Sequence, residues 1–224
     1  MAFLGHLEML RLWQRAMRRA NLPLAYSSGF NPHPRIAFGS ALAVGIESLA
    51  EYMDVELTQE IDIEIFRNKL QRELPEGLQL LLVCPIPTKS PALTYVINTA
   101  AYKTIWLEKP NKDLLHNKIE KLLAQSSIEI TRRGKSGIKK KDIRPGIFNL
   151  NISPELDLEM LLQCSSTGSV RPEEVLKALD FDVPAKFIRT GLFIKKDDSL
   201  IPPENIAVNM GKVELSEQRN INSG

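Results

Sequence analysis

The chain has 224 residues, of which 43% are hydrophobic and 25% charged, and its 29 lysines and arginines against 27 acids give a formal charge of +2. This is the composition of a folded protein with one large domain or two small ones, and it excludes collagen, wholesale disorder and disulfide-rich miniproteins. No apolar run approaches the ~20 residues that a membrane helix needs. Arginines also interrupt the apolar pattern where a secretory signal would lie. We therefore expect a cytoplasmic protein with no membrane contact.

Only two cysteines are present, Cys84 and Cys164, and each lies within an apolar run. Because reducing compartments disfavour disulfides, they are predicted to be buried free thiols. Two distant cysteines do not supply a structural zinc site or an iron–sulfur cluster. We therefore expect neither a metal nor a cofactor.

The first half of the chain predicts two helices and several short strands. Apolar residues at helical spacing over residues 3–20 predict an amphipathic helix. Strands are predicted at 22–27, 35–39 and 51–57, followed by a second helix with Asp62 as its N-cap and a buried strand at 78–84. This order resembles a ferredoxin-type sandwich, strand-helix-strand twice over, whose first strand is missing.

The second half predicts a complete unit of the same kind. Strands are expected at 101–108, 127–132, 147–152, 156–164 and 186–194, with helices at 112–125 and 172–179. The predicted fold class is therefore α+β, with two ferredoxin-like α/β sandwich units in tandem at residues 1–90 and 98–194. Residues 195–224 are polar and lack periodicity, which predicts a disordered tail.

Charge is segregated along the chain. Between Glu47 and Glu64 there are acids but no lysine or arginine, whereas residues 131–144 are densely basic and contain one acid. The glycines of this basic block free the backbone to approach a phosphate, so the block is either a solvated loop or an anion-binding element. It is not a P-loop, because the upstream glycine and the strand-loop-helix setting are missing.

Two histidines are candidates for general acid–base catalysis. An imidazole near neutral pKa can exchange a proton with a ribose hydroxyl, and His6 and His33 are the two candidates. The alternatives are that His6 bonds to a nearby carbonyl at a helix start and that His33 is simply held by its flanking prolines. Neither lies at metal-ligand spacing from another histidine or a glutamate. His116 lies on a predicted helix and is expected at the surface.

The polar side of the first helix and the loop that follows it suit nucleotide contact. Arginines share one side of the helix, and aromatic, amide and imidazole groups follow in the loop, where they could stack on bases and contact phosphates. The alternatives are a solvated helix face and a loop fixed by a buried Phe30. With the basic block, the candidate RNA-binding residues are Arg11, Arg15, Arg18, Tyr26, Phe30, Asn31, His33, Arg35, Arg132, Arg133, Lys135, Lys139, Lys140, Lys141 and Arg144.

Several phrases of the sequence resemble the radical-SAM-linked protein family, a bacterial domain of unknown function that is fused to, or encoded beside, a radical SAM enzyme. The resemblance spans residues 2–194. Members of that family usually carry a strand and a basic glycine turn before the Phe-Leu-(Ser)-His phrase, where this chain starts, so we expect either an earlier start or a first sheet that lacks a strand. The matching phrases are Phe3-Leu4-Gly5-His6-Leu7-Glu8, Arg15-Ala16-Met17-Arg18-Arg19-Ala20, the stretch from Leu22 to Pro34 that ends in Asn31-Pro32-His33-Pro34, Val44-Gly45-Ile46-Glu47-Ser48 with Glu51-Tyr52, Asp142-Ile143-Arg144-Pro145, Ser169-Val170-Arg171-Pro172-Glu173-Glu174-Val175 and Arg189-Thr190-Gly191-Leu192.

The resemblance implies an accessory role beside a radical SAM protein, which would supply the radical chemistry because this chain has no cysteine triad. The leading hypothesis is a non-catalytic RNA-binding adaptor that presents structured RNA, tRNA or rRNA, to a radical SAM modifying enzyme. One alternative is a metal-independent ribonuclease that uses His6 or His33. Another is a protein-interaction module whose acidic strip at residues 47–64 docks the radical SAM partner without RNA contact.

Overall fold

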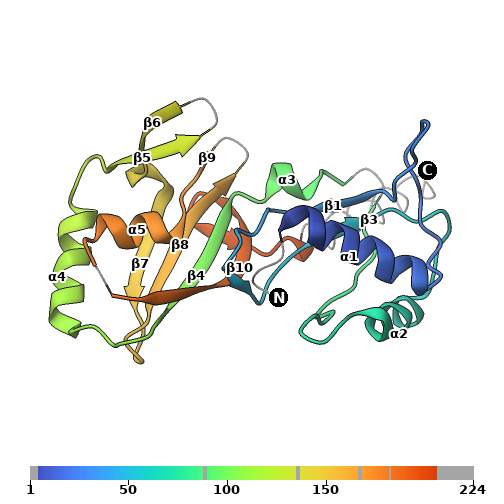
Figure 1. Cartoon of the computed structure of the whole chain (residues 1–224), viewed down its shortest axis with the longest axis horizontal. Helices are drawn as coiled ribbons and strands as arrows, with labels where there is room; N and C mark the ends of the chain where they lie inside the picture. Colours follow the sequence, from blue (N-terminus) through green and yellow to red (C-terminus); the bar gives the residue numbers. More distant parts are fainter. Residues whose placement is uncertain (1–4, 88–89, 135–136, 166–167, 182, 206–224) are drawn as a thin grey trace, which may run out of the picture. The chain divides into compact units, whose positions relative to one another are not determined.

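The computed structural model describes residues 5–87, 90–134, 137–165, 168–181 and 183–205 (Figure 1). These residues form an α+β fold of five α-helices, one mixed seven-stranded sheet and two two-stranded sheets. The chain divides into two compact units: unit 1 comprises residues 1–44, 51–96 and 196–224, and unit 2 comprises residues 45–50 and 97–195. Within the described residues, no helix is long and apolar enough to cross a membrane.

Unit 1 contains helices α1 (His6–Arg19), α2 (Ile63–Glu73) and α3 (Leu93–Val96), and the antiparallel strands β1 (Ile36–Phe38) and β3 (Met53–Val55). The Glu8 carboxylate accepts a hydrogen bond from the Gly5 amide at 2.8 Å, which satisfies one free donor at the start of α1. The Asp62 carboxylate caps α2 by accepting from the Ile65 amide at 2.9 Å. The two predicted helices and the Asp62 cap are confirmed.

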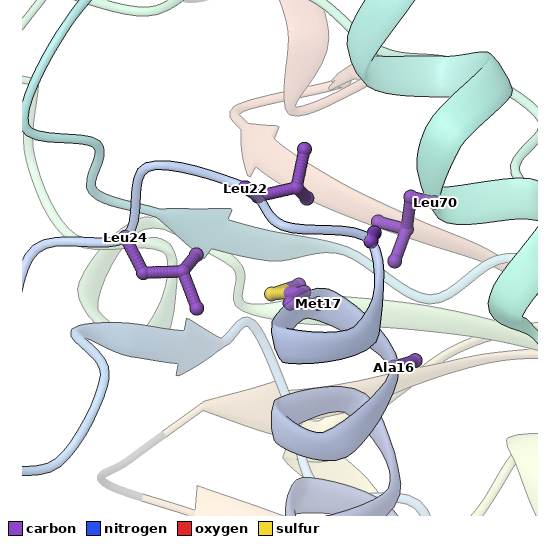
Figure 2. Packing of buried hydrophobic residues seen from close by; sticks show 6 residues of the cluster. Ala16, Met17, Leu22, Leu24 and Leu70 are labelled. Carbon is purple, nitrogen blue, oxygen red and sulfur yellow. The ribbon is translucent and has the colours of Figure 1, made fainter.

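The core of unit 1 forms where α1 and α2 meet the chain that leads to β1 (Figure 2). Met17 and Leu70 are completely buried, and Figure 2 shows Leu22 and Leu24 directed toward them. Burial of each large aliphatic side chain contributes roughly 1.5–3 kcal/mol. The partly buried residues packed against this core are Trp13, Ile36, Met53, Val55, Leu57, Ile61, Phe66, Leu74 and Leu80.

Two strand predictions in unit 1 are wrong. Residues 22–27 form only isolated bridges, and residues 78–84 form no strand. Leu80 packs on the core, but Leu81 and Leu82 are 64% and 57% exposed, and Cys84 is an exposed free thiol rather than a buried one. The physical reason is that a strand requires a hydrogen-bonded neighbour, and no described strand pairs with residues 78–84.

Unit 2 is built around the strand that follows α3. Its elements in chain order are β2 (Glu47–Ser48), β4 (Thr99–Trp106), α4 (Lys112–Leu123), β5 (Glu129–Gly134), β6 (Gly137–Asp142), the short 3₁₀ helix η1 (Arg144–Gly146), β7 (Ile147–Ile152), β8 (Leu158–Ser165), β9 (Gly168–Ser169), α5 (Pro172–Ala178) and β10 (Ala185–Lys196). The strands and helices predicted for this half are confirmed, with ends that move by a few residues.

The main sheet has the central order β10-β4-β8-β7, and all three of these pairings are antiparallel. β2 joins β10 in parallel, β9 pairs with β8, and β11 (Ser199–Ile201) completes the seven strands. Alternate residues of β4, including Tyr102, Thr104 and Trp106, are buried, which gives the sheet one closed face. The tail prediction is wrong at its start, because β10 and β11 extend into it; residues 206–224 lie outside the described residues.

Candidate nucleic-acid interface

The arginines of α1 lie on its solvent side. Arg11, Arg15 and Arg18 are all exposed, while Ala16 and Met17 on the other side are buried. Their spacing of four and three residues places the three guanidinium groups on one helix face. Within the described chain, Arg11 and Arg15 form no ion pair, so their charges remain available to an anion.

Beside this face lies an open depression of about 290 Å³ between α1 and the end of α2. Arg15 lines it, and so does Arg19, which hydrogen-bonds to the Glu73 carboxylate at 2.8 Å and to the Glu73 carbonyl at 2.7 Å. Arg19 therefore joins the two helices, whereas Arg15 presents its charge at the surface.

The chain between α1 and β1 makes a closed finger, residues 25–35. Its base is fixed by backbone bonds from Arg35 to the Ala25 carbonyl and from Ser27 to the His33 carbonyl, both at 2.9 Å. The Ser27 hydroxyl also accepts from the His33 amide at 3.0 Å. Glu56, the residue after β3, supports the base, because its carboxylate receives two 3.0 Å hydrogen bonds from Arg35. Arg35, a predicted RNA contact, is therefore engaged in holding the finger.

The tip of the finger carries an aromatic ring in full solvent exposure. The Phe30 side chain is fully exposed to solvent, so the alternative of a buried Phe30 is wrong. Gly29 precedes it at φ +121°, a conformation that favours glycine and turns the chain at the tip. Nearer the base, the exposed Tyr26 ring lies 6.0 Å from the Arg18 guanidinium, at the limit of a cation–π contact. Asn31 is also exposed. Unit 1 thus brings an arginine of α1 and an aromatic side chain of the finger together.

The two candidate catalytic histidines both lie in unit 1 and are both exposed. The His6 ring meets the Phe38 ring edge-on with centroids 5.5 Å apart, so the predicted carbonyl partner is replaced by an aromatic one. His33 is held in the finger by its backbone. Neither imidazole hydrogen-bonds to a described residue, which leaves both without an orienting group of the kind that acid–base catalysts use. His116 is at the surface beside Glu120, as predicted.

The basic block of unit 2 is a β-hairpin and not a loop, which corrects the sequence prediction. β5 and β6 pair antiparallel, with Arg132 opposite Lys139 and Arg133 opposite Ile138. Opposite residues share one face of such a ladder. Arg132, Lys139 and Lys141 therefore share a face with Ile130, and Arg133 and Lys140 lie on the other face.

Two of the predicted RNA-binding cations instead anchor the hairpin. The Arg132 guanidinium donates to both Glu174 carboxylate oxygens at 2.6 Å and to the Ser169 carbonyl at 2.7 Å. Lys141 donates to the same carbonyl at 2.9 Å. Burial lowers the pKa of Lys141, and the charge of Arg132 lowers it further. Burial raises the pKa of Glu174, but the hydrogen bonds from Arg132 and the Arg171 amide outweigh it and leave that pKa below its ordinary value.

Arg144 is also structural. Its guanidinium donates to the Leu123 carbonyl at 3.0 Å and the Ile147 carbonyl at 3.2 Å, so it closes the end of α4. The Asp142 carboxylate accepts from the Ile128 and Arg144 amides at 2.8 and 2.9 Å, which lowers its pKa. Glutamates from outside the block therefore neutralise part of its charge, Glu174 from α5 and Glu129 from across the hairpin.

Three predicted cations of the hairpin remain at the surface. Arg133 and Lys139 are exposed and pair with no described residue, and the exposed Lys140 meets Glu129 across the hairpin at 3.0 Å in solvent. Such an exposed pair contributes little and yields easily to another anion. Lys135 lies outside the described residues. Ile138, 64% exposed and opposite Arg133 across the hairpin, adds an exposed apolar side chain that sequence reasoning missed, because the sequence carries no apolar alternation there.

The acidic segment is divided between the two units. Residues 47–50 belong to unit 2 and residues 51–64 to unit 1. Within it Asp54 is half-buried, and burial raises its pKa; Glu56 is neutralised by Arg35. In the described part of the chain, no three histidine, cysteine or acidic side chains are grouped to hold a metal ion. Sequence reasoning also missed the supporting roles of Ser27 and Glu56, which only the closed finger reveals.

Comparison with known proteins places the chain in a bacterial family whose function is uncharacterised. Residues 1–172 match the family model described as an uncharacterized protein conserved in bacteria, DUF2344. No curated protein matches the chain. The matched region includes α1, the finger and the basic hairpin. The chain therefore belongs to the DUF2344 family of uncharacterised bacterial proteins.

Proposed function

We propose that this protein is a non-catalytic RNA-binding adaptor whose finger stacks on unpaired bases while the arginines of α1 contact phosphates. The observation that carries the proposal is the fully exposed Phe30 on a finger whose base is fixed by hydrogen bonds. A phenyl ring has only two side-chain torsions to fix when a base stacks on it, and the closed base of the finger already fixes the backbone that carries it. Arg11, Arg15 and Arg18 supply positive charge in the same unit.

The basic hairpin is proposed as a second phosphate contact, through Arg133, Lys139 and Lys140. The proposed interface does not include Arg132, Lys141 and Arg144, because the side chains of these residues donate hydrogen bonds to backbone carbonyls within unit 2. We further propose that the RNA is a tRNA or rRNA and that a radical SAM enzyme is the partner to which it is presented, as the family resemblance implies.

A ferredoxin-like origin of both units belongs to the same proposal. In unit 2, the strand-helix-strand-strand-helix-strand order and the central sheet order β10-β4-β8-β7 support it, with the β5–β6 hairpin as an insertion after α4. In unit 1, α1, β1, β3 and α2 follow the order expected after a first strand. Fold likeness does not assign a function, so the RNA proposal depends on the finger.

The test is fluorescence anisotropy of the protein with labelled bulk tRNA and labelled rRNA fragments, titrated with sodium chloride. We expect micromolar or tighter binding that weakens steeply with salt. Phe30→Ala should weaken binding roughly 5- to 100-fold, which corresponds to the loss of one base stack. The matched control is Tyr95→Ala on α3, another highly exposed aromatic residue of unit 1, which should bind as the wild type does.

The phosphate contacts are tested by the salt slope. Removing one contacting cation, as in Arg15→Ala or Arg133→Ala, should reduce the slope by about 1 across RNA sequences. Flat titrations with a folded protein would refute the adaptor proposal. Cleavage of the RNA in EDTA that disappears in His6→Ala or His33→Ala would assign a ribonuclease instead.

A further inference from the structure

The β5–β6 hairpin has one face fixed to unit 2 and one face in solvent. On the fixed face, Arg132 and Lys141 donate to the Ser169 carbonyl at 2.7 and 2.9 Å. The hairpin is a two-stranded sheet of its own, and Figure 1 shows it extending away from the main sheet of unit 2. Residues that alternate with Arg132 and Lys141 along the strands lie on the other side, which we call the open face.

Two rungs of the ladder make up the centre of the open face. Thr131 lies opposite Lys140, and Arg133 lies opposite Ile138. All four side chains are exposed. Residues on neighbouring rungs of one face are diagonal neighbours about 7–8 Å apart, within reach of long side chains. The open face therefore presents two cations, a hydroxyl and an apolar side chain together.

The charge of the open face increases toward its distal end. Glu129 and Asp142 form the rung nearest the root of the hairpin, and Glu129 meets Lys140 at 3.0 Å in solvent. The rung beyond Arg133 pairs Gly134 with Gly137, and apart from chain neighbours no described atom lies within 4 Å of where a Cβ would stand on either glycine. The cationic end of the face is thus flat and uncovered.

The chemistry of the open face specifies its ligand. Arginine and lysine attract phosphates, but the described residues of this face include no aromatic ring on which an unpaired base would stack. Bases that are already paired need no such ring. Double-stranded RNA has a wide, shallow minor groove that displays ribose 2′-hydroxyls beside the phosphates, whereas its major groove is too deep and narrow for side chains to read. A flat face with a hydroxyl and an apolar side chain fits the shallow groove.

We propose that the open face of the hairpin binds the minor groove of double-stranded RNA. Arg133 and Lys140 contact phosphates, the Thr131 hydroxyl hydrogen-bonds to a ribose 2′-hydroxyl, and Ile138 packs on the sugars. This inference rests on the proposed RNA-binding function and deepens it, because it assigns the paired part of a structured RNA to unit 2 and leaves the unpaired bases to the finger of unit 1.

The test compares a blunt RNA duplex of about 16 base pairs with a DNA duplex of the same sequence, by fluorescence anisotropy of the full chain. We expect the RNA duplex to bind about tenfold more tightly. Thr131→Val removes the hydroxyl and keeps a residue that suits a strand. It should weaken RNA binding about 3- to 10-fold, the effect of one hydrogen bond, and leave DNA binding unchanged. Thr131→Ser retains the hydroxyl and should restore the preference for RNA.

The phosphate contacts are tested on the same duplexes. Arg133→Ala should reduce the salt slope by about 1. Lys121→Ala is the matched control, because it removes an exposed lysine of α4 and should leave the slope unchanged. Equal affinity for the two duplexes would overturn the proposal, and so would a Thr131→Val effect that is the same on both.

A single-stranded RNA separates this inference from the proposed function. Phe30→Ala should weaken binding of the single strand and leave binding of the duplex unchanged. If the single strand bound in a manner that depends on Phe30 and the duplex did not bind, the hairpin inference would be overturned while the adaptor proposal stood. If neither RNA bound the folded protein, both would be overturned.

Discussion

The hairpin of unit 2 offers a sharp test of which cations are structural, because adjacent arginines have opposite roles. Arg132 makes three hydrogen bonds of 2.6–2.7 Å to Glu174 and Ser169, and the side chains of the ion pair are 28% and 15% exposed. Removing one partner of a fully buried pair costs about 3–5 kcal/mol, and an exposed pair contributes below about 1 kcal/mol. For this partly exposed pair we expect Arg132→Ala to cost about 2 kcal/mol of hairpin stability.

The assay is hydrogen exchange of residues 129–142 at neutral pH, followed by mass spectrometry. A loss of about 2 kcal/mol corresponds to exchange roughly 30-fold faster when the hairpin opens locally. Arg133→Ala is the control, because it removes the neighbouring arginine, which has no described partner, and its exchange should stay within about threefold of wild type. If the two variants exchanged alike, the assignment of Arg132 as the anchor would be refuted.

Three further predictions follow from burial and ionisation. The depressed pKa of Glu174 means that its carboxylate stabilises unit 2 fully above its ordinary pKa of 4.5, and that this stabilisation is lost as pH falls through the lower folded value; urea midpoints should show this acid loss in wild type but not in Glu174→Gln. Leu70→Ala should lower the free energy of unfolding of unit 1 by about 2–5 kcal/mol, because Leu70 is completely buried. Leu81→Ala should change that free energy by less than about 0.5 kcal/mol, because Leu81 is exposed. Both are measured by urea denaturation, and similar losses in the two variants would contradict the exposed position of Leu81. Burial and the Glu204 hydrogen bond raise the pKa of Tyr52 far above that of a free phenol, so Tyr52→Phe should leave the 295 nm absorbance titration of the folded protein unchanged below about pH 11; a lost titration step there would show an accessible hydroxyl.

Local sequence pattern was sufficient to predict features that depend on residues close together in the chain. The α1 arginines were placed correctly at the surface because helical periodicity determines which side chains share a face. Asp62 was recognised as a cap because its carboxylate acts on an amide three residues away. In unit 2, alternation located β7 at Ile147–Ile152.

Contacts between residues that are far apart in the sequence could not be predicted from local pattern. Arg132 and Glu174 are 42 positions apart, and an arginine in a basic run gives no sign that a carboxylate will meet it. The finger is similar: its aromatic and amide residues are recognisable in the sequence, but the exposure of Phe30 depends on the closure of the finger's base and on Glu56, which follows β3.

The sequence by itself determined the α+β class, the helices with their caps, most strands of unit 2 and the chemical character of the basic and aromatic segments, because each depends on near neighbours in the chain. Only the tertiary structure decided which cations stay free and which apolar segment finds a partner. Residues 78–84 have the apolar composition of a buried strand, yet Leu81 and Leu82 lie exposed and the segment pairs with no described strand. Strand formation depends on hydrogen bonds to a second segment, and the sequence of one segment does not contain its neighbour.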